Sequence, residues 1–410
     1  MASHLTRRSA LALASAPLLG MTLPRLALAA PATGEARFVL VILRGGMDGL
    51  GAVPAIGDPG YAAARGELAA DPATVLRLSG DFALSPALGG WDALYRSGEL
   101  AVVHAVASAY RERSHFDAQD LLEGGAAVPH GSDSGWLNRA LAALPQPAGT
   151  DRRLGLALGT SIPLVLRGKQ PVASWEPDRA PGSPPELIAT LAKLYEGDPL
   201  LGPALRDGFR INARNAELLG EAAMGDAPRG DQAFATLAEL GGKLLAAPDG
   251  ARIAVLEIGG WDTHAGQGGG AARGSEPPAG RLPRALAQLA AGILALKTGL
   301  GEAWRDTVVV MATEFGRTVA ANGTGGTDHG TASAMFLAGG AIKGGRVIAN
   351  WPGLGKASLQ DGRDLKPTLD QRAVFKAVLS QHLKLSDGAL NTRVFPDSAG
   401  VKPMAGLLRA

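Results

Sequence analysis

The stretch Arg37-Phe-Val-Leu-Val-Ile-Leu-Arg-Gly-Gly-Met-Asp-Gly49 is a continuous apolar run that ends in two glycines and an acidic residue. Apolar residues without polar alternation are typical of a parallel strand that is covered on both faces. The glycines break the run, so Asp48 follows in the loop that leaves the strand. We therefore predict a buried parallel strand over residues 37–43.

Similar apolar runs recur along the chain and are separated by helical stretches. Leu, Ala and Ile recur at helical spacing over residues 281–300, which predicts a long amphipathic helix. Buried strands that alternate with helices predict a three-layer α/β fold, in which a mostly parallel central sheet carries helices on both faces. The further strands are expected at residues 101–103, 154–158, 253–258, 307–312 and 334–337.

The composition is that of a globular protein, and although length alone would allow two or three domains, α/β enzymes of this length are often one unit. The chain has 410 residues, of which 46% are hydrophobic and 19% charged, so it can bury a sizeable core. Its 57 glycines and 27 prolines indicate many turns and long loops. We expect one domain over residues 30–410, with loop excursions near residues 170–185, which are rich in proline, and 267–280, which are rich in glycine.

The first 29 residues have the pattern of an export signal. Thr6-Arg-Arg-Ser-Ala-Leu11 resembles the twin-arginine translocation motif, and an apolar stretch and the small-residue run Ala27-Leu-Ala29 follow. An uncleaved amphipathic helix is the alternative. The signal predicts that the twin-arginine translocase carries the protein to a periplasmic or secreted location. No later apolar run has the roughly 20 residues that a membrane span requires.

Charge and cysteine content exclude other classes. Lys and Arg total 40 against 38 Asp and Glu, and no basic cluster stands out, which argues against nucleic acid as a partner. The chain has no cysteine, so disulfides, thiolate metal sites and a cysteine nucleophile are excluded. Any metal must be bound by His, Asp, Glu or Asn.

Polar residues gather at the predicted strand ends, where open α/β sheets bind their ligands. Carboxylates and imidazoles follow three of the predicted strands, and a further acid–histidine pair precedes another. Such side chains suit a divalent cation such as Zn, Mn or Mg. The candidate metal ligands are Asp48, Asp262, His264, Glu314, Asp328 and His329.

Each candidate has a structural alternative. An Asp after Gly-Gly commonly caps a helix or turn, and this is the alternative for Asp48. His104, inside an apolar run, fits a core histidine with satisfied hydrogen bonds. His130 and His382 stand outside the strand-end clusters, and we assign them structural roles.

Several motifs together resemble the family called domain of unknown function 1501, and the resemblance covers nearly the whole chain after the signal. That family is similar to the alkaline phosphatase and sulfatase superfamily, whose members carry two metal ions at the carboxyl edge of a parallel sheet. The resemblance implies metal-binding roles for Asp48, for Asp262 with His264, and for His329. The motifs are 43–49 (LRGGMDG), 113–120 (RSHFDAQD), 260–264 (GWDTH), 313–318 (TEFGRT) and 322–330 (NGTGGTDHG).

The sequence also departs from the superfamily pattern. Phe315 stands where the superfamily has a metal-binding His, so the resemblance implies either a single-metal site or an altered one. The superfamily places its nucleophile at a helix N-terminus, and Ser114 is the best local match, with a simple helix cap as its alternative. Arg113 or Arg317 could hold the substrate anion, with salt bridging as the alternative for either.

These observations lead to a metal-dependent periplasmic hydrolase of phosphate or sulfate esters, with one or two divalent ions, Zn or Mn, and a small anionic ester as substrate. The alternative is a non-catalytic exported protein that uses the same fold for binding or assembly. A metal-free acyl hydrolase that uses Ser114 is a third reading, and the absence of a G-x-S-x-G motif argues against it.

Overall fold

The computed structural model describes residues 35–145, 153–177, 185–199, 201–220, 230–268 and 279–409. All of these described residues belong to one compact unit. The export-signal motif lies outside the described residues. Within the described part of the chain, no helix is both long and apolar enough to cross a membrane.

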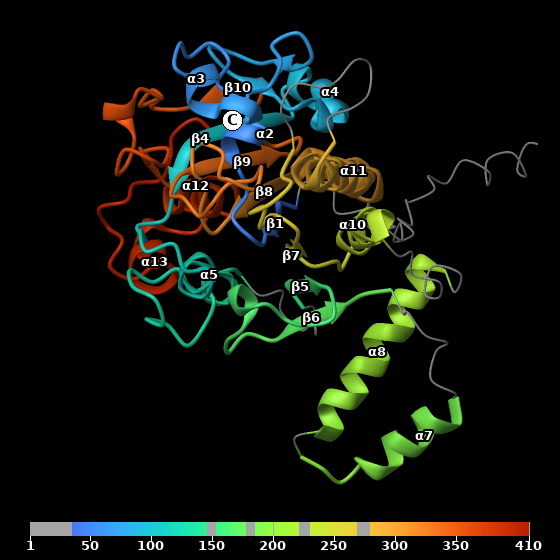
Figure 1. Cartoon of the computed structure of the whole chain (residues 1–410). Coiled ribbons are helices and arrows are strands. Elements are labelled where there is room, and N and C mark those ends of the chain that lie inside the picture. The colour runs from blue at the N-terminus through green and yellow to red at the C-terminus, as the bar shows by residue number, and fades with distance from the viewer. Residues whose placement is uncertain are drawn as a thin grey trace, which may run out of the picture. The chain divides into compact units, whose positions relative to one another are not determined.

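A mostly parallel sheet forms the centre of the fold (Figure 1). Among the described residues it has nine strands, in the order β10-β4-β9-β8-β1-β7-β5-β6, with β11 also paired to β4. All pairings are parallel except those of β9, which runs antiparallel to both β4 and β8. The strands are β1 (Arg37–Leu43), β4 (Leu100–Ala107), β5 (Gly155–Leu158), β6 (Val172–Trp175), β7 (Ile253–Ile258), β8 (Thr307–Thr313), β9 (Ser333–Ala338), β10 (Arg346–Ile348) and β11 (Leu369–Asp370); β2 (Leu76–Arg77) and β3 (Ala83–Leu84) form a separate hairpin.

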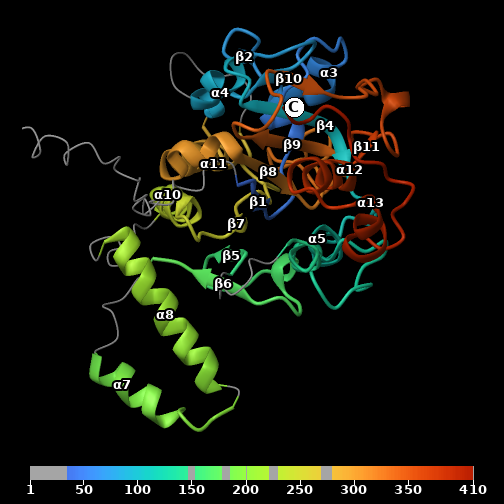
Figure 2. The same cartoon turned by 180° about the vertical axis from the view of Figure 1, so that it is seen from behind.

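Helices cover both faces of the sheet, as Figures 1 and 2 show from opposite sides. Side chains of β1 alternate between two cores: Val39, Val41 and Leu43 face one, and Phe38 and Leu40 face the other. The predicted three-layer α/β class is therefore confirmed. The helices are α2 (Gly49–Ala52), α3 (Tyr61–Arg65), α4 (Asp92–Arg96), α5 (His115–Gly124), α6 (Trp136–Leu141), α7 (Pro185–Leu194), α8 (Leu201–Leu219), α10 (Ala233–Ala246), α11 (Arg281–Leu300), α12 (Gln371–Ala377) and α13 (Asp387–Ala389).

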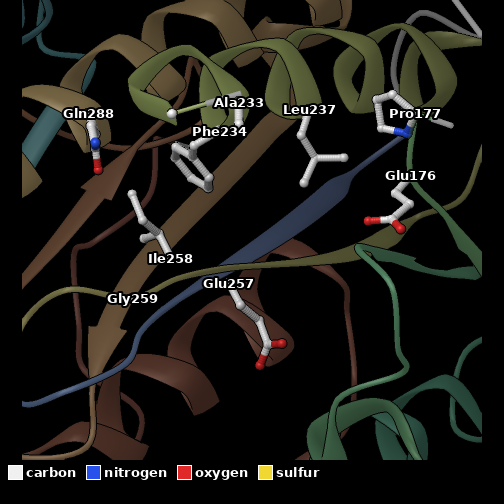
Figure 3. Close-up of a pocket in the computed structure, with 10 residues that line it drawn as sticks. Glu176, Pro177, Ala233, Phe234, Leu237, Glu257, Ile258, Gly259 and Gln288 are labelled. Atoms are coloured by element: carbon white, nitrogen blue, oxygen red, sulfur yellow. The ribbon is translucent and has the colours of Figure 1, made fainter. Parts of the chain in front are cut away.

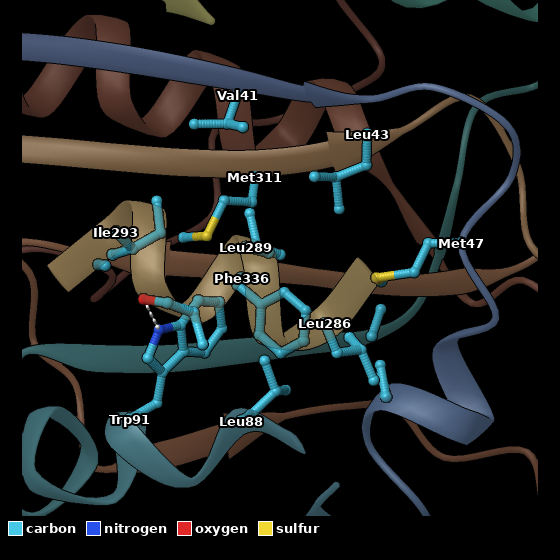
Figure 4. Close-up of a cluster of buried hydrophobic side chains, with 14 of the residues drawn as sticks. Val41, Leu43, Met47, Leu88, Trp91, Leu286, Leu289, Ile293, Met311 and Phe336 are labelled. Carbon is cyan, nitrogen blue, oxygen red and sulfur yellow. Dashed lines mark hydrogen bonds between the residues drawn. The ribbon is translucent and has the colours of Figure 1, made fainter. Parts of the chain in front are cut away.

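Helix α11 supplies much of the core on its face of the sheet (Figure 4). Leu286, Leu289 and Ile293 recur at helical spacing and are almost fully buried against the sheet residue Met311. The indole of Trp91 closes this core and donates a hydrogen bond to the carbonyl of Ala290 on α11 over 3.3 Å. This packing fixes the strands whose ends carry the candidate site.

One of the two predicted loop excursions contains a strand. The range 170–185 contains strand β6, which extends the sheet beside β5, because Val172–Trp175 adds a parallel ladder to that edge. In the range 267–280, Gln267 is fully buried, and Gly280 packs directly against it. Residues 269–278 lie outside the described part of the chain.

Candidate metal centre

The loops that carry the candidate residues leave neighbouring parallel strands. Leu43 of β1 aligns with Ile258 of β7 on one side and with Thr313 of β8 on the other. The following loops therefore start side by side at the carboxyl edge of the sheet. Gly45 has a φ of +125°, and a Cβ placed there would lie 2.6 Å from the backbone nitrogen of Asp262. Glycine thus allows the loop after β1 to pass directly against the loop after β7.

Four side chains converge at this edge. One ligand atom each from His115, Asp262 and His329 lies within 4.8 Å of the other two. Asp262 Oδ1 is 3.6 Å from His115 Nε2, 3.5 Å from His329 Nε2 and 3.1 Å from His264 Nε2. His264 Nε2 is also 3.0 Å from His329 Nε2. We call His115, Asp262, His264 and His329 the histidine–aspartate cluster.

Each imidazole of the cluster is held at its Nδ1 atom by an acceptor. His115 Nδ1 lies 2.8 Å from Glu314 Oε1, and His264 Nδ1 lies 3.1 Å from Asp328 Oδ1. His329 Nδ1 lies 2.9 Å from the carbonyl oxygen of Arg113. Metal-binding histidines commonly donate their second ring N–H to a carboxylate or carbonyl in this way.

These partners place the protons on Nδ1 and leave Nε2 lone pairs facing one another. Two such lone pairs 3.0 Å apart, at His264 and His329, repel unless a cation or a proton lies between them. The Nε2 atom of His115 is buried and has no hydrogen-bond partner among the described residues. Imidazole nitrogens and a carboxylate oxygen are common ligands of zinc and of other transition metals. The residues present therefore fit a divalent ion.

Glu314 orients His115 through its contact with the Nδ1 atom of that histidine. Its buried Oε1 accepts hydrogen bonds from the Gly45 amide over 2.9 Å and from Gln119 over 3.0 Å, in addition to the His115 contact. Burial alone would raise the pKa of Glu314, but these hydrogen bonds together lower it. The contact with Glu314 in turn raises the pKa of His115. The carboxylate predicted as a metal ligand thus orients a histidine of the cluster.

Asp262 is the acidic member of the cluster and is about half exposed. The buried guanidinium of Arg317 donates to Asp262 Oδ1 over 2.6 Å. Burial would raise the pKa of Asp262, but the hydrogen bond and charge of Arg317, with the nearby histidines, lower it. Arg317 therefore acts on the aspartate, and its Nε and Nη1 atoms have no hydrogen-bond partner among the described residues.

Asp48 lies apart from the cluster. Its Oδ1 accepts from the backbone amides of Leu50 and Gly51 and caps helix α2. Its Oδ2 accepts from Arg65 over 2.5 Å and from Gln267 over 2.6 Å, all in buried surroundings. The capping alternative raised from the sequence is thus what the structure contains, and Arg65 supplies the positive charge beside the carboxylate.

Phe315 and Asp328 complete the surroundings of the cluster. The ring centroid of Phe315 lies 4.7 Å from that of His115 and 5.1 Å from that of His329, so the phenyl ring forms an apolar wall. Asp328 is half exposed, and its Oδ1 accepts from Asn322 as well as from His264. Asp328 therefore contacts the outer side of a histidine in the cluster.

Ser114 and Arg113 precede His115 at the start of α5. Ser114 is the N-cap residue of this helix, but its side chain makes no capping hydrogen bond. The Arg113 guanidinium is bound to Asp361 and Asp364, both over 2.8 Å. The structure thus gives Arg113 the salt-bridging contacts proposed as its alternative, and its carbonyl oxygen holds His329.

His115 is the member of the cluster that the sequence reasoning missed. A strand-end rule limited to residues directly beside a strand does not cover His115, which comes after a loop of seven residues beyond Ala107. Strand β4 runs in the same direction as β8, because both are antiparallel to β9. Extending the rule to the whole loop after β4 would have found it.

The three other histidines in the described part of the chain lie outside the cluster, as the sequence predicted. His104 is fully buried, with Nε2 3.0 Å from the carbonyl of Val53. His382 Nε2 lies 2.9 Å from the carbonyl of Arg37. His130 is exposed and lies within 4 Å of Asp117 and Asp120 rather than in the cluster.

A pocket of about 290 Å³ opens at the carboxyl end of β7 (Figure 3). Its walls include Phe234 and Leu237 of α10 and the strand-end residues Ile258 and Gly259. Figure 3 shows the Glu257 carboxylate directed away from Phe234 and Ile258, and this carboxylate pairs with Arg44. One of its lining residues, Gly259, is three positions before Asp262 in the sequence.

Comparisons with known proteins concern the family and the fold. A family model described as "Protein of unknown function (DUF1501)" matches residues 102–395. No curated protein matches the sequence. Solved structures similar to the chain include a 2-O GAG sulfatase, with 10% identity, a TM-score of 0.39 and coverage of 91% of this chain and 76% of the other.

Two further solved structures show the same level of similarity. The C-terminal periplasmic domain of EcEptC from Escherichia coli, in complex with Zn, has 10% identity and a TM-score of 0.35, with 75% of this chain and 74% of the other covered. The phosphonate monoester hydrolase of Agrobacterium radiobacter has 12% identity and a TM-score of 0.31, with 85% and 74% covered.

Proposed function

The chain belongs to the family described as "Protein of unknown function (DUF1501)", and from this premise we propose that it is a metal-dependent hydrolase of phosphate or sulfate esters. The proposal rests on one observation. The Nε2 atoms of three histidines and one oxygen of Asp262 face one another, while each histidine is oriented from behind.

We propose that the histidine–aspartate cluster holds one divalent ion, with Zn or Mn as the candidates. Asp48 is not a further ligand in this proposal, because Arg65 already neutralises it. When bound, such an ion would stabilise negative charge that develops on an ester during hydrolysis. The cluster is accessible to a small anionic ester, since the side chains of Asp262 and His264 are each about half exposed.

Ser114 is the proposed nucleophile. It adjoins His115, is partly exposed, and makes no capping hydrogen bond, although its side chain contacts that of Tyr110. Its oxygen would form a bond to the phosphorus or sulfur atom as the bond to the leaving oxygen breaks, and water would then hydrolyse the resulting serine ester. Amides at the start of the ten-residue helix α5 favour an anion at this position.

The second candidate is an exported binding or assembly protein that retains the metal without turnover. Two observations favour it: Phe315 fills the space beside His115 and His329 with a phenyl ring, and the Nη2 atom of Arg317 is bound to Asp262. In that case the ion would hold the loops together, and the esters would not be cleaved.

Cleavage of an ester substrate distinguishes the proposed hydrolase from the proposed binding or assembly protein. Metal-loaded protein should cleave an aryl phosphate or an aryl sulfate, and Ser114→Ala should keep its metal and fold but lose turnover. Ser386→Ala is the control, because Ser386 only caps the short helix α13. A metal-loaded protein that cleaves neither ester over a range of pH would favour the binding candidate. Turnover that survives Ser114→Ala would remove the serine from the proposal.

We further propose that residues 1–29 are a twin-arginine signal, that residues 30–410 form the exported domain, and that the mature protein is periplasmic or secreted. The support is the Arg7–Arg8 pair followed by an apolar stretch and a small-residue cleavage site. Replacing both arginines with lysine should retain the precursor in the cytoplasm, as fractionation and immunoblotting would measure. Normal export of that variant would contradict the proposal.

A further inference from the structure

Gln267 joins the two loops that carry most of the histidine–aspartate cluster. Its side chain is fully buried. Its Oε1 accepts from Thr263 Oγ1 over 2.7 Å and from Thr327 Oγ1 over 2.5 Å. Thr263 stands between Asp262 and His264, and Thr327 is two residues before His329. One amide oxygen therefore contacts both ligand-bearing loops.

The direction of this amide is fixed by its other contact. Gln267 Nε2 donates over 2.6 Å to Asp48 Oδ2, which also accepts from Arg65. An ionised carboxylate can only accept hydrogen bonds, so the NH₂ group must face Asp48 and the amide oxygen must face the threonines. Both threonine hydroxyls then donate to it. Asp48 and Arg65 thus set the orientation of an amide that holds two loops.

The backbone repeats this connection. The backbone N–H of Gln267 donates to the carbonyl of Gly325, and the backbone N–H of Thr327 donates to the carbonyl of Thr263. A Cβ at Gly326 would lie 2.3 Å from the backbone of His264, so the two loops are in direct contact. The side-chain amide of Gln267 therefore lies where the two loops are already in contact through their backbones.

We propose that Gln267 is a positioning residue that sets the distance between Asp262 and His264 on one loop and His329 on the other, and thereby the affinity for the divalent ion. The inference rests on the proposed function for its metal. The position is not expected to touch substrate, since Gln267 is completely buried. Outer groups of this kind typically change metal affinity by about 10–100-fold when replaced.

The test replaces Gln267 with methionine, which has a similar volume and no hydrogen-bonding amide. Zn²⁺ affinity is measured by competition with a chromophoric chelator, and backbone hydrogen exchange is measured on the metal-free protein. Gln371→Met is the matched control, because Gln371 is also buried but lies on helix α12. Thr327→Val, which removes one contact only, is a milder variant in case Gln267→Met folds poorly.

Gln267→Met should weaken Zn²⁺ binding about 10-fold or more and speed exchange in residues 263–267 and 325–327 together, while Gln371→Met changes neither. In a Thr263→Val/Thr327→Val background, Gln267→Met should add little further loss of Zn²⁺ affinity, because the contacts of its amide oxygen with both loops are already gone. Unchanged Zn²⁺ affinity in folded Gln267→Met or Thr327→Val protein would overturn the proposal. If the unaltered protein binds no metal, the proposed function fails, and exchange alone decides whether Gln267 positions the loops.

Discussion

At the scale of single residues, the acids of this site contact different nitrogen atoms of the histidines, and residue type alone does not predict which. Asp262 faces the Nε2 atoms of the cluster, whereas Glu314 and Asp328 contact Nδ1 atoms from behind. All three carboxylates were candidate ligands on the basis of sequence. Which atom of a histidine an acid reaches depends on the packing of distant loops, and strand-end position does not determine it.

His104 should make stability depend on pH. Burial lowers its pKa to about 4, against an ordinary value of 6.5, although a hydrogen bond to Val53 opposes the shift. The unfolded chain therefore takes up the proton first, so stability should be complete above pH 6.5 and fall between pH 6.5 and about 4. The loss corresponds to roughly 3 kcal/mol.

Urea unfolding at several pH values measures this dependence. His104→Asn should flatten the fall in stability between pH 6.5 and 4, whatever its effect at neutral pH, because the buried titrating group is gone. His130→Asn is the control and should keep the fall, since His130 is exposed. Equal slopes in the unaltered protein and in His104→Asn would show that His104 does not carry the effect.

Residue roles were therefore only partly predictable. Asp262 and His264 could be selected from the sequence because they follow an apolar run, and His329 because it precedes one. His115 was missed because it follows a longer loop, and the pairing of Asp48 with Arg65 depends on a contact between residues 17 positions apart. Neither a loop path nor a buried ion pair has a periodic signal in sequence.

At the scale of elements, helices α10 and α11 approach closely through glycines. A Cβ at Gly299 of α11 would lie 2.0 Å from the carbonyl oxygen of Glu239 on α10, and one at Gly242 of α10 would lie 2.8 Å from that of Leu296. The two backbones can pack at this distance only because neither position carries a side chain. Both helices cover the same face of the sheet.

Gly299→Ala should force these helices apart and lower the free energy of unfolding by about 1–3 kcal/mol, as other overpacked cores do. Gly208→Ala is the matched control, because it also lies inside a helix, α8, but a Cβ there meets nothing within 4 Å. That control should be neutral or stabilise by up to about 1 kcal/mol. Urea denaturation of both variants measures the difference, and a neutral Gly299→Ala would contradict the close packing.

Elements with a strong pattern were predicted well. The predicted bounds of β1, β7 and α11 agree with the structure, because each is a long apolar or amphipathic run. Strand β6 was missed, since Val172–Trp175 is short and lies in a proline-rich stretch. Its pairing with β5 depends on tertiary contact rather than on a local signal.

At the scale of the whole molecule, the sheet brings distant segments to one edge. Residues of the cluster come from positions 115, 262, 264 and 329, and they meet because β4, β7 and β8 end at the same edge. The sequence predicted this edge as the place of the site. It left open whether one ion or two would bind there, and the Arg65–Asp48 pair favours one.

The metal content of the purified protein tests the central claim most directly. Protein prepared without chelator should contain about one equivalent of Zn or Mn by inductively coupled plasma mass spectrometry. His115→Ala should lose most of it, while His130→Ala, which changes an exposed histidine outside the cluster, should retain it. Protein that contains no divalent ion, or whose ion is retained equally in His115→Ala, would contradict the account.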